Sequence, residues 1–474
     1  MSTTSDRPAV PEWLTQPHDA NALVEAVWPE GAVRDDAGAI VFGGVSAAEL
    51  AERFGTPLYV VDEDLVRARA REVLTAFRDA AARHGGTARV YYAGKALLTT
   101  DVVRWVTAEG LGVDVASGGE LAVALAAGAD PARLGLHGNN KLPSEISRAV
   151  RVGVGSIVID SLVEIERIAA EAESQGRVQT VLIRVNSGVH AETHDFLATA
   201  HEDQKFGFAL TDAEAAVARI RELPWLRFAG LHCHIGSQIF GTAGFAESAA
   251  RVVELHARLR EGGDVPLLNL GGGFGIAYTS KDDPTPIAKL ADGIVAAVGR
   301  ECESRGIPMP ELAFEPGRTI VGRAGVTLYR VGTVKPVRVS DDLERLYVSV
   351  DGGMSDNART ALYGADYSAR IASRRSDSAP ALTRVVGRHC EAGDIVVSDE
   401  YLPGDVEPGD LVAVAATGAY CFSLASNYNY LTRPPVVAVS AGTARLIVRG
   451  EDENDLLARD LGVAPASRTS EESA

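Results

Sequence analysis

The spacing of hydrophobic residues along the 474-residue chain changes near residue 326. Between about residues 65 and 325, short β-branched runs alternate with alanine-rich amphipathic stretches, a pattern typical of repeated β-α units around a parallel sheet. The strands predicted here are Arg89–Tyr92, Gly112–Val115, Arg133–Leu136, Ser156–Ile159, Thr180–Val185, Ala229–His232, Leu267–Leu270 and Glu311–Phe314. Eight units of this kind predict a closed (β/α)8 TIM barrel of the α/β class.

After residue 326 the helical period stops and strands separated by turn residues follow. These predicted strands are Val326–Val334, Leu346–Val350, Asp394–Leu402, Leu411–Ala415, Val436–Val439 and Ala444–Val448. They indicate a C-terminal all-β, barrel-like domain. Two strand-like segments before the barrel, Ile40–Phe42 and Leu58–Val61, are expected to join that domain.

The resulting domain plan has five parts. It runs through an N-terminal extension (1–35), strands joining the β domain (36–64), the barrel (65–325), the β domain (326–450) and a tail (451–474). The N-terminal part is rich in Pro, Asp and Ala, and the last dozen residues are rich in Ser, Thr and Glu. Both ends are therefore expected to be tails or loosely packed extensions.

Composition narrows the function further. With 46% hydrophobic and 23% charged residues the chain can bury a large core, whereas its net charge of −18 argues against binding to nucleic acid or an anionic membrane. The sequence shows neither a secretory signal nor a membrane-spanning run. Its cysteines lie far apart, at Cys233, Cys302, Cys390 and Cys421. This spacing argues against a disulfide framework and a zinc site, and it favours the cytoplasm.

Polar and reactive residues recur where the predicted barrel strands end. Lys95, Asp114, His137, Asp160, Asn186 and His234 stand at the ends of the first six strands in turn. The last two strands lead into Gly271–Gly275 and Glu315–Arg318, where this fold usually binds phosphate. Because barrel enzymes gather catalysis at the carboxyl ends of their strands, this pattern favours a barrel over an open sheet.

Lys95 is the central candidate. An isolated lysine is usually a surface residue, but Lys95 follows an apolar strand, so its amine is expected in the barrel mouth rather than in solvent. There it could bind an aldehyde cofactor covalently, provided that a phosphate cradle and a partner for the ring nitrogen are present. The backbone of Gly271–Gly275 could provide the cradle, although such a turn is often only structural. That run lacks the features of nucleotide-binding loops, which leaves a small phosphate.

Glu315 and Arg318 offer the other groups. Glu315 could keep a pyridine nitrogen protonated, and Arg318 could bind a carboxylate in a bidentate manner. A salt bridge between them is the ordinary alternative, which Pro316 and Gly317 make less favourable.

Two histidines flank Cys233 on the sixth strand. Alternating histidines can mark a metal site, but no carboxylate or third ligand is close to them in sequence, so no metal is predicted. His234 is interpreted as a flat ring against a cofactor, with Ser237 as a phosphate donor, and His232 as a core histidine.

Candidate residues also occur in the β domain. Cys390 and Glu391 form a thiol and acid pair that could donate a proton, although a buried apolar cysteine is the alternative. Arg359 and Tyr363 are four residues apart and could share a helical face toward an anion. Tyr420 adds a phenol.

From about residue 40 to 450 the chain resembles the diaminopimelate decarboxylases, which belong to the alanine-racemase-like, fold-type III decarboxylases. The motifs that carry the resemblance are Tyr-Ala-Gly-Lys-Ala (92–96), His-Ile-Gly-Ser-Gln (234–238), Gly-Gly-Gly-Phe-Gly (271–275), Glu-Pro-Gly-Arg (315–318), Cys-Glu-Ala-Gly-Asp (390–394) and Gly-Ala-Tyr (418–420). The resemblance implies decarboxylation of meso-2,6-diaminopimelate to L-lysine and carbon dioxide, the last step of lysine biosynthesis. It also implies a homodimer with shared active sites.

The resemblance further implies roles for individual residues. Lys95 would carry pyridoxal 5'-phosphate, His234 would stack on its ring, and Cys390 of the partner subunit would return a proton to the substrate. The residues expected at the cofactor are Lys95, Asp114, His234, Ser237, Gly272, Gly273, Glu315, Pro316, Gly317, Arg318 and Tyr420. Those expected at the substrate are Arg318, Arg359, Tyr363, Glu391 and Tyr420. Gly188 to Gly207 would form a mobile lid.

Three alternatives remain open from the sequence. A decarboxylase of ornithine, arginine or carboxynorspermidine would share the barrel, but such relatives tend to carry aspartate where Glu391 stands. An amino-acid racemase would share the fold with different motifs in the second domain. A catalytically inactive homologue acting as a binding protein would be expected to have lost the lysine, the glutamate or the thiol, all of which are present.

Overall fold

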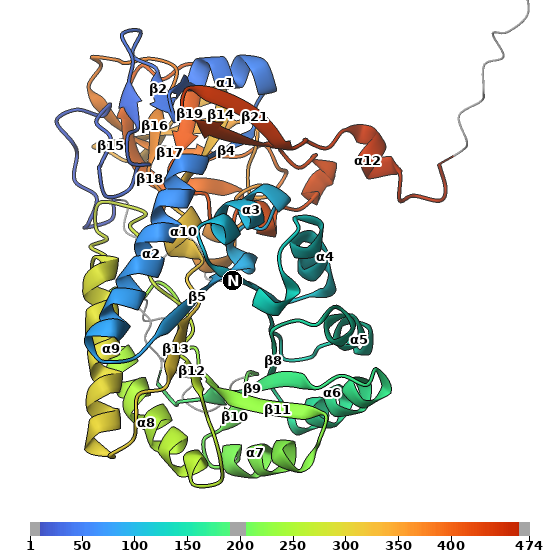
Figure 1. Ribbon diagram of the computed structural model, residues 1–474. Helices are drawn as coiled ribbons and strands as arrows, with labels where there is room; N and C mark the ends of the chain where they lie inside the picture. The colour runs from blue at the N-terminus through green and yellow to red at the C-terminus, as the bar shows by residue number, and fades with distance from the viewer. Residues whose placement is uncertain (1–9, 190–204, 464–474) are drawn as a thin grey trace, which may run out of the picture.

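The structure, a computed structural model, describes residues 10–189 and 205–463. It shows a barrel surrounded by helices and, packed against one side of it, a domain rich in strands (Figure 1). The central part of the predicted lid and the last residues of the predicted tail lie outside the described residues. Among those that are described, no helix combines the length and the apolar character needed to cross a membrane.

The barrel is a closed ring of parallel strands, which confirms the predicted fold class. The strands are β5 (Ala88–Ala93), β6 (Gly112–Val115), β7 (Leu134–Leu136), β8 (Ser156–Ile159), β9 (Gln179–Asn186), β11 (Leu226–His232), β12 (Leu267–Asn269) and β13 (Glu311–Phe314). Each pairs with the next, β13 pairs with β5, and the short β10 (Phe208–Ala209) pairs with β9. Because all strands run the same way, their carboxyl ends meet at one mouth.

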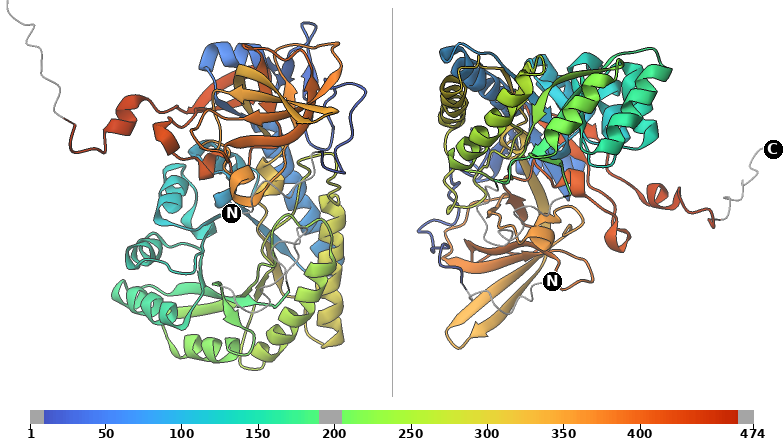
Figure 2. Two further views of the ribbon diagram at one scale, coloured as in Figure 1. Left: turned by 180° about the vertical axis from the view of Figure 1, so that it is seen from behind. Right: turned by 90° about the horizontal axis from the view of Figure 1, so that it is seen from below.

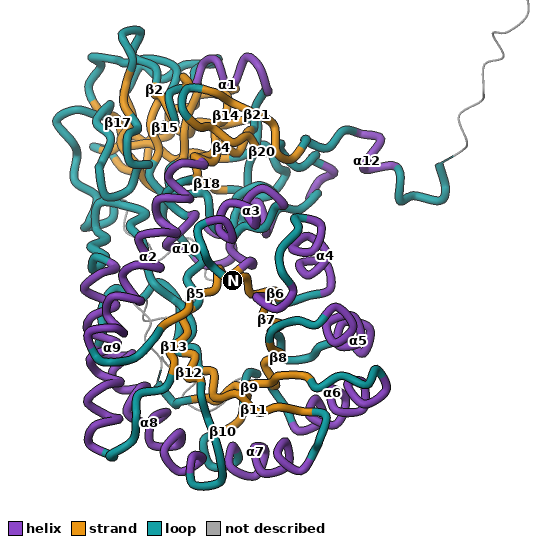
Figure 3. The backbone as a smooth tube through the Cα atoms, viewed as in Figure 1, coloured by secondary structure: helices purple, strands orange, loops and turns teal. Residues whose placement is uncertain are grey.

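Amphipathic helices form the outer layer around these strands (Figure 3). They are α2 (Glu63–Arg83), α3 (Thr100–Ala108), α4 (Gly118–Ala126), α5 (Pro143–Val152), α6 (Leu162–Ser174), α7 (Ala213–Glu222), α8 (Ala243–Arg260) and α9 (Ile287–Ser304). Several begin at a side-chain cap: the Thr99 hydroxyl accepts a hydrogen bond from the Val102 N–H, and Ser117 accepts one from Glu120. Alanine and β-branched residues on the inner face of each helix pack on the strands.

The second domain combines strands from both ends of the chain (Figure 2). Its strands are β4 (Leu58–Asp62), β14 (Gly325–Ser340), β15 (Leu343–Val350), β16 (Ala369–Ile371), β17 (Pro380–Val386), β18 (Ile395–Pro403), β19 (Leu411–Val414), β20 (Val436–Ser440) and β21 (Thr443–Val448). The early strand β4 lies between β14 and β20. This placement confirms that the domain takes an N-terminal strand.

The segment Ile40–Phe42 does not pair with the strands of the β domain, contrary to the expectation from the sequence. As β2 it belongs to a separate small sheet with β1 (Val33–Arg34) and β3 (Val45–Ser46). Gly43 and Gly44 both have positive φ angles, which allows β2 to turn back tightly and pair with β3. The sheet still touches the β domain, because the Ile40 N–H donates to the Ala372 carbonyl.

The N-terminal extension is not loosely packed after residue 20, so that expectation is wrong there. Val27 and Trp28 are buried, and they pack in one cluster with residues of the β domain. The Asn21 amide donates to the Ser376 carbonyl, and the Arg34 guanidinium donates to the Ile371 carbonyl. A proline-rich composition therefore did not prevent packing, because a few large apolar residues anchor the segment.

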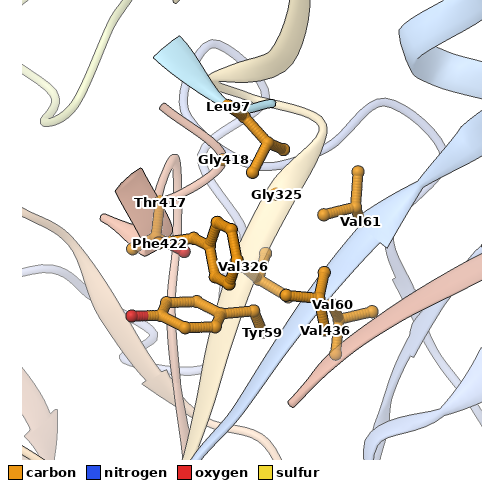
Figure 4. A pocket seen from close by; sticks show the side chains of 10 residues that line it. All are labelled: Tyr59, Val60, Val61, Leu97, Gly325, Val326, Thr417, Gly418, Phe422 and Val436. Carbon is orange, nitrogen blue, oxygen red and sulfur yellow. The ribbon is translucent and has the colours of Figure 1, made fainter. Parts of the chain in front are cut away.

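The two domains pack against each other next to the segment that carries Lys95. A cavity of about 10 Å³ lies at this joint. Figure 4 shows residues that line it, among them Tyr59, Leu97, Gly325, Gly418 and Phe422. Such a volume is no larger than about one water-sized sphere. A methyl group on Gly418 would lie 1.9 Å from the Val321 carbonyl oxygen. The joint therefore fixes the segments that carry Lys95 and Tyr420 relative to each other.

Candidate active site

The barrel mouth brings together residues that the sequence places far apart. Lys95 lies in a short 3₁₀ turn (η2, Gly94–Ala96) that follows β5, and it interacts electrostatically with Asp114, His137 and His234. Its side chain is exposed, in contrast to the expectation that it turns away from solvent. The mouth thus gathers one amine, two carboxyl groups and several imidazoles around an accessible floor.

Glu315, just after β13, accepts hydrogen bonds on the floor of this mouth. The Asn269 amide nitrogen donates to Glu315 Oε1 over 2.7 Å, and the same oxygen lies 3.1 Å from His232 Nε2. His137 Nε2 lies 3.6 Å from Glu315 Oε1 and 3.2 Å from Asp114 Oδ1. The carboxylate is therefore held by Asn269 of β12 and His232 of β11, and the imidazole of His137, which follows β7, lies beside them.

These contacts shift the pKa values of Asp114 and Glu315 in opposite directions. Burial and the neighbouring Glu315 charge raise the pKa of Asp114 well above its usual value. Burial also acts to raise the pKa of Glu315, but His232 and His137 outweigh it and hold that pKa well below the usual range. Burial lowers the pKa of His232 and His137. The arrangement therefore favours an ionised Glu315 and shifts the neighbouring Asp114 toward its protonated form.

No metal is predicted from the sequence because no carboxylate or third ligand lies close to the histidines along the chain, but the fold brings such residues together. His137, His232 and Glu315 each place a ligand atom within 4.8 Å of the others, so a carboxylate and a third ligand do accompany His232. They come from three strands, and only closure of the barrel reveals them. Because Asn269 already occupies one Glu315 oxygen at hydrogen-bond distance, we interpret the cluster as a hydrogen-bonded carboxylate.

The glycine run after β12 is shaped by close backbone contacts. A methyl group on Gly273, whose φ is +104°, would lie 2.3 Å from the Gly236 carbonyl oxygen. The N–H groups of Gly271 and Gly272 donate to Asn269 and to His234 Nδ1, respectively. Of the predicted glycines, Gly273 is therefore the one on which the phosphate prediction chiefly rests.

Arg318 begins the short helix α10 (Arg318–Val321) and is buried at the mouth. Its guanidinium donates to the hydroxyls of Ser237 (2.9 Å) and Tyr278, and it stacks 4.7 Å from the Tyr420 ring centroid. The Arg359 guanidinium lies 4.7 Å from the Tyr278 ring centroid. Tyr278, which the sequence did not single out, thus links both arginines.

Arg359 and Tyr363 do not share an environment, although both lie on α11 (Arg359–Tyr363). Arg359 is buried and donates to the Tyr367 hydroxyl over 2.6 Å, whereas Tyr363 is 68% exposed. The helix has only five residues and ends at Gly364, which has a left-handed conformation. A spacing of four residues on this helix thus does not give the two side chains the same surroundings.

Cys390 and Glu391 are exposed in a turn of the β domain. The Cys390 N–H donates to the Asn429 side chain, and the Tyr428 hydroxyl lies 3.3 Å from Glu391. His389 beside them is buried, lies 3.0 Å from Asp394 and stacks on Tyr428. The described chain therefore presents this thiol and this carboxylate outward on a well-supported loop.

The buried residue Asp356, which precedes α11, is expected to make the stability of the fold depend on pH. It accepts the Gly353 N–H, and burial raises its pKa to about 7 from 3.8. The folded protein therefore binds more protons at this site than the unfolded chain does, so stability decreases as the pH rises from about 4 to 7. This contribution amounts to up to about 4 kcal/mol.

Urea unfolding of Asp356→Asn and of the unchanged protein at pH 5 and pH 8 measures this contribution. We expect the variant to gain stability relative to the unchanged protein at pH 8 and little at pH 5. An equal difference at both pH values would contradict the assignment to Asp356.

The sequence and the fold are both similar to those of known proteins. Residues 66–322 match the family profile "Pyridoxal-dependent decarboxylase, pyridoxal binding domain". The chain is 52% identical to a diaminopimelate decarboxylase of Mycobacterium tuberculosis, over 93% of this chain and 98% of that protein. It is 42% identical to that of Bacillus subtilis, over 90% and 95%. The diaminopimelate decarboxylase structure from M. jannaschii superposes with a TM-score of 0.85 and 32% identity, covering 92% of this chain and 99% of that one. A structure of the M. jannaschii enzyme with L-lysine superposes equally well.

Proposed function

The chain belongs to the pyridoxal-dependent decarboxylases, and on this basis we propose that it converts meso-2,6-diaminopimelate to L-lysine and carbon dioxide, the last step of lysine biosynthesis. The observation that carries the proposal is the barrel mouth, where Lys95, the Glu315 cluster and Arg318 lie together. Relatives that bear the name diaminopimelate decarboxylase and align over nearly their full length support it.

The residues present fit pyridoxal 5'-phosphate. The ionised Glu315 suits a protonated ring nitrogen, Lys95 supplies the amine for a covalent link, and Asp114 Oδ2 is a buried oxygen without a partner among the described residues. When bound, the cofactor would supply an electron-accepting ring for the electrons left by the departing carboxylate. His234 would pack on that ring, and Ser237 and Gly273 would bind its phosphate.

Arg318 and Arg359 would recognise the distal carboxylate of the substrate. Both guanidiniums are buried and are oriented by Tyr278, which prepares two positive charges in an otherwise acidic protein. Substrate specificity would depend also on Glu391, which suits a distal ammonium group.

We propose further that the protein is a homodimer with shared active sites. Cys390, Glu391 and Tyr363 are exposed, and the hydroxyl of the exposed Tyr428 lies 3.3 Å from Glu391. A partner subunit covering this surface would place Cys390 where it can return a proton to the substrate carbon. The cytoplasmic location stays a prediction, with which the four free cysteines agree.

Release of carbon dioxide from meso-diaminopimelate, with ornithine and arginine tested alongside, checks the proposal on protein loaded with cofactor. We expect release from diaminopimelate alone. Release from ornithine or arginine instead would keep the chemistry but replace the substrate. Failure to release carbon dioxide from any amino acid would favour a non-catalytic role.

Gly273→Ala should weaken binding of pyridoxal phosphate about tenfold or more, because its methyl group meets the Gly236 carbonyl and distorts the phosphate cradle. Titration of the apoprotein with the cofactor measures the effect. Gly306→Ala is a matched control, because Gly306 also has a positive φ (+64°) but has nothing within 4 Å of the new methyl group. Equal affinities for the Gly273 and Gly306 variants would contradict the cradle.

A further inference from the structure

The proposed function needs Glu315 to be a carboxylate, yet a carboxyl group in a buried site prefers to be protonated. The structure shows what opposes that preference. Glu315 receives the Asn269 amide over 2.7 Å, and His232 Nε2 lies 3.1 Å and 3.2 Å from its two oxygens. His137 Nε2 lies next to both Glu315 and Asp114, and its ring stands edge-on to that of His232 at 5.1 Å. Two imidazoles thus surround one carboxylate.

We propose that His232 and His137 are positioning residues that hold Glu315 as a carboxylate on the floor of the barrel, ready to pair with a protonated ring nitrogen. This inference rests on the proposed function, because the ring belongs to the cofactor of that function. The sequence alone does not predict this role. It indicates only that His232 is a core histidine and that His137 stands at the end of a strand.

The charge state of the histidines decides how they act. Burial lowers the pKa of both, so that they are neutral at neutral pH. A neutral imidazole donates one N–H, and the Nδ1 atom of His232 has no partner among the described residues, which leaves its proton on Nε2 toward Glu315. His232 therefore stabilises the Glu315 charge by a hydrogen bond, and His137 lies beside the carboxylate without adding a positive charge that would compete with the ring nitrogen.

The other charged or titratable groups around Glu315 come from several elements. They are Asp114 on β6, Arg184 on β9, His234 after β11 and Lys95 after β5, which acts on Asp114, His137 and His234. Burial and the Glu315 charge raise the pKa of Asp114, which disfavours a second negative charge beside Glu315. The positive charge of Arg184 favours the ionised form of Glu315. The hydrogen bond from the histidine side is the one between His232 and Glu315.

The test compares pyridoxal phosphate with its 1-deaza analogue, in which a carbon replaces the ring nitrogen. Apoprotein is titrated with each compound, and the ratio of the two dissociation constants is measured. In the unchanged protein we expect pyridoxal phosphate to bind more tightly. In His232→Leu that preference should decrease about tenfold or more, because binding of the protonated nitrogen weakens while contacts to the phosphate remain.

His232→Gln should restore most of the preference, because its amide nitrogen reaches the position of Nε2. His137→Leu and His137→Gln repeat the comparison at the second imidazole, in case either His232 variant does not fold. His256→Leu is the matched control, since His256 is equally buried but lies on the outer helix α8. It should leave the ratio unchanged.

The outcomes separate the inference from the function on which it rests. If His232→Leu and His137→Leu weaken both compounds equally, the histidines are merely structural and the inference is wrong. If the unchanged protein binds neither compound, the proposed function itself fails. A preference that disappears in the leucine variants and returns with glutamine supports the inference.

Discussion

Replacement of Lys95 by alanine should reduce carbon dioxide release from meso-diaminopimelate by a factor on the order of 10⁴ or more. Lys95 is the lysine placed at the carboxyl end of the first barrel strand, beside Asp114, His137 and His234. Without its amine the covalent link to the cofactor and the exchange with the substrate amine are both lost. The structure around it should remain intact, because its side chain is exposed.

The measurement is the steady-state rate, together with reduction by borohydride, which fixes a covalently bound cofactor to the protein. The variant should retain cofactor only reversibly. Lys289→Ala provides the control, because Lys289 is an exposed lysine on the outer helix α9 and should change neither property. A Lys95→Ala protein with the unchanged rate would defeat the proposed chemistry.

Cys390→Ala should lower kcat about 10²-fold to 10³-fold, the usual contribution of a proton donor. Because Cys390 is exposed on its own chain and would act in the partner's site, a second result is expected from mixtures. Reassociated mixtures of Cys390→Ala and Lys95→Ala, each almost inactive, should recover about a quarter of the normal activity, since half of the dimers then contain one intact site.

The control mixture combines Lys95→Ala with Glu315→Gln. Both residues belong to the barrel mouth of one chain, so each site in a mixed dimer carries one defect and no recovery is expected. Recovery in the first mixture alone would support shared sites. Absence of recovery in both, despite mixed dimers being present, would show that each chain completes its own site.

Much of the architecture was predictable because it follows from local pattern. The β8 and β13 strands begin and end at the predicted residues. A buried parallel strand appears in the sequence as a short apolar run with polar residues at its ends. Two strands of the second domain were missed. β16 has only three residues, and β17 begins at a proline, which is ordinarily a mark of a loop.

The candidate site was predictable only where a motif stands in one stretch of sequence. Lys95, Arg318 and Cys390 were identified from their neighbours along the chain. The link that Tyr278 makes between two arginines and the cluster around Glu315 depend on barrel closure, which no local pattern encodes. Tyr363 shows the opposite case, because the four-residue spacing predicted shared surroundings with Arg359, whereas Arg359 is buried and Tyr363 is exposed.

The insertion of β4 between β14 and β20 has a consequence for synthesis. Tyr59 pairs with Thr327 on one side and with Val436 on the other, so β4 leaves the ribosome long before its second neighbour exists. At 5–20 residues per second the wait is about 20 to 75 s. The barrel can close during this interval, while β4 keeps the edge that later binds β20 unpaired and prone to association. A nascent chain arrested before β20 should therefore bind chaperones until the last strands emerge.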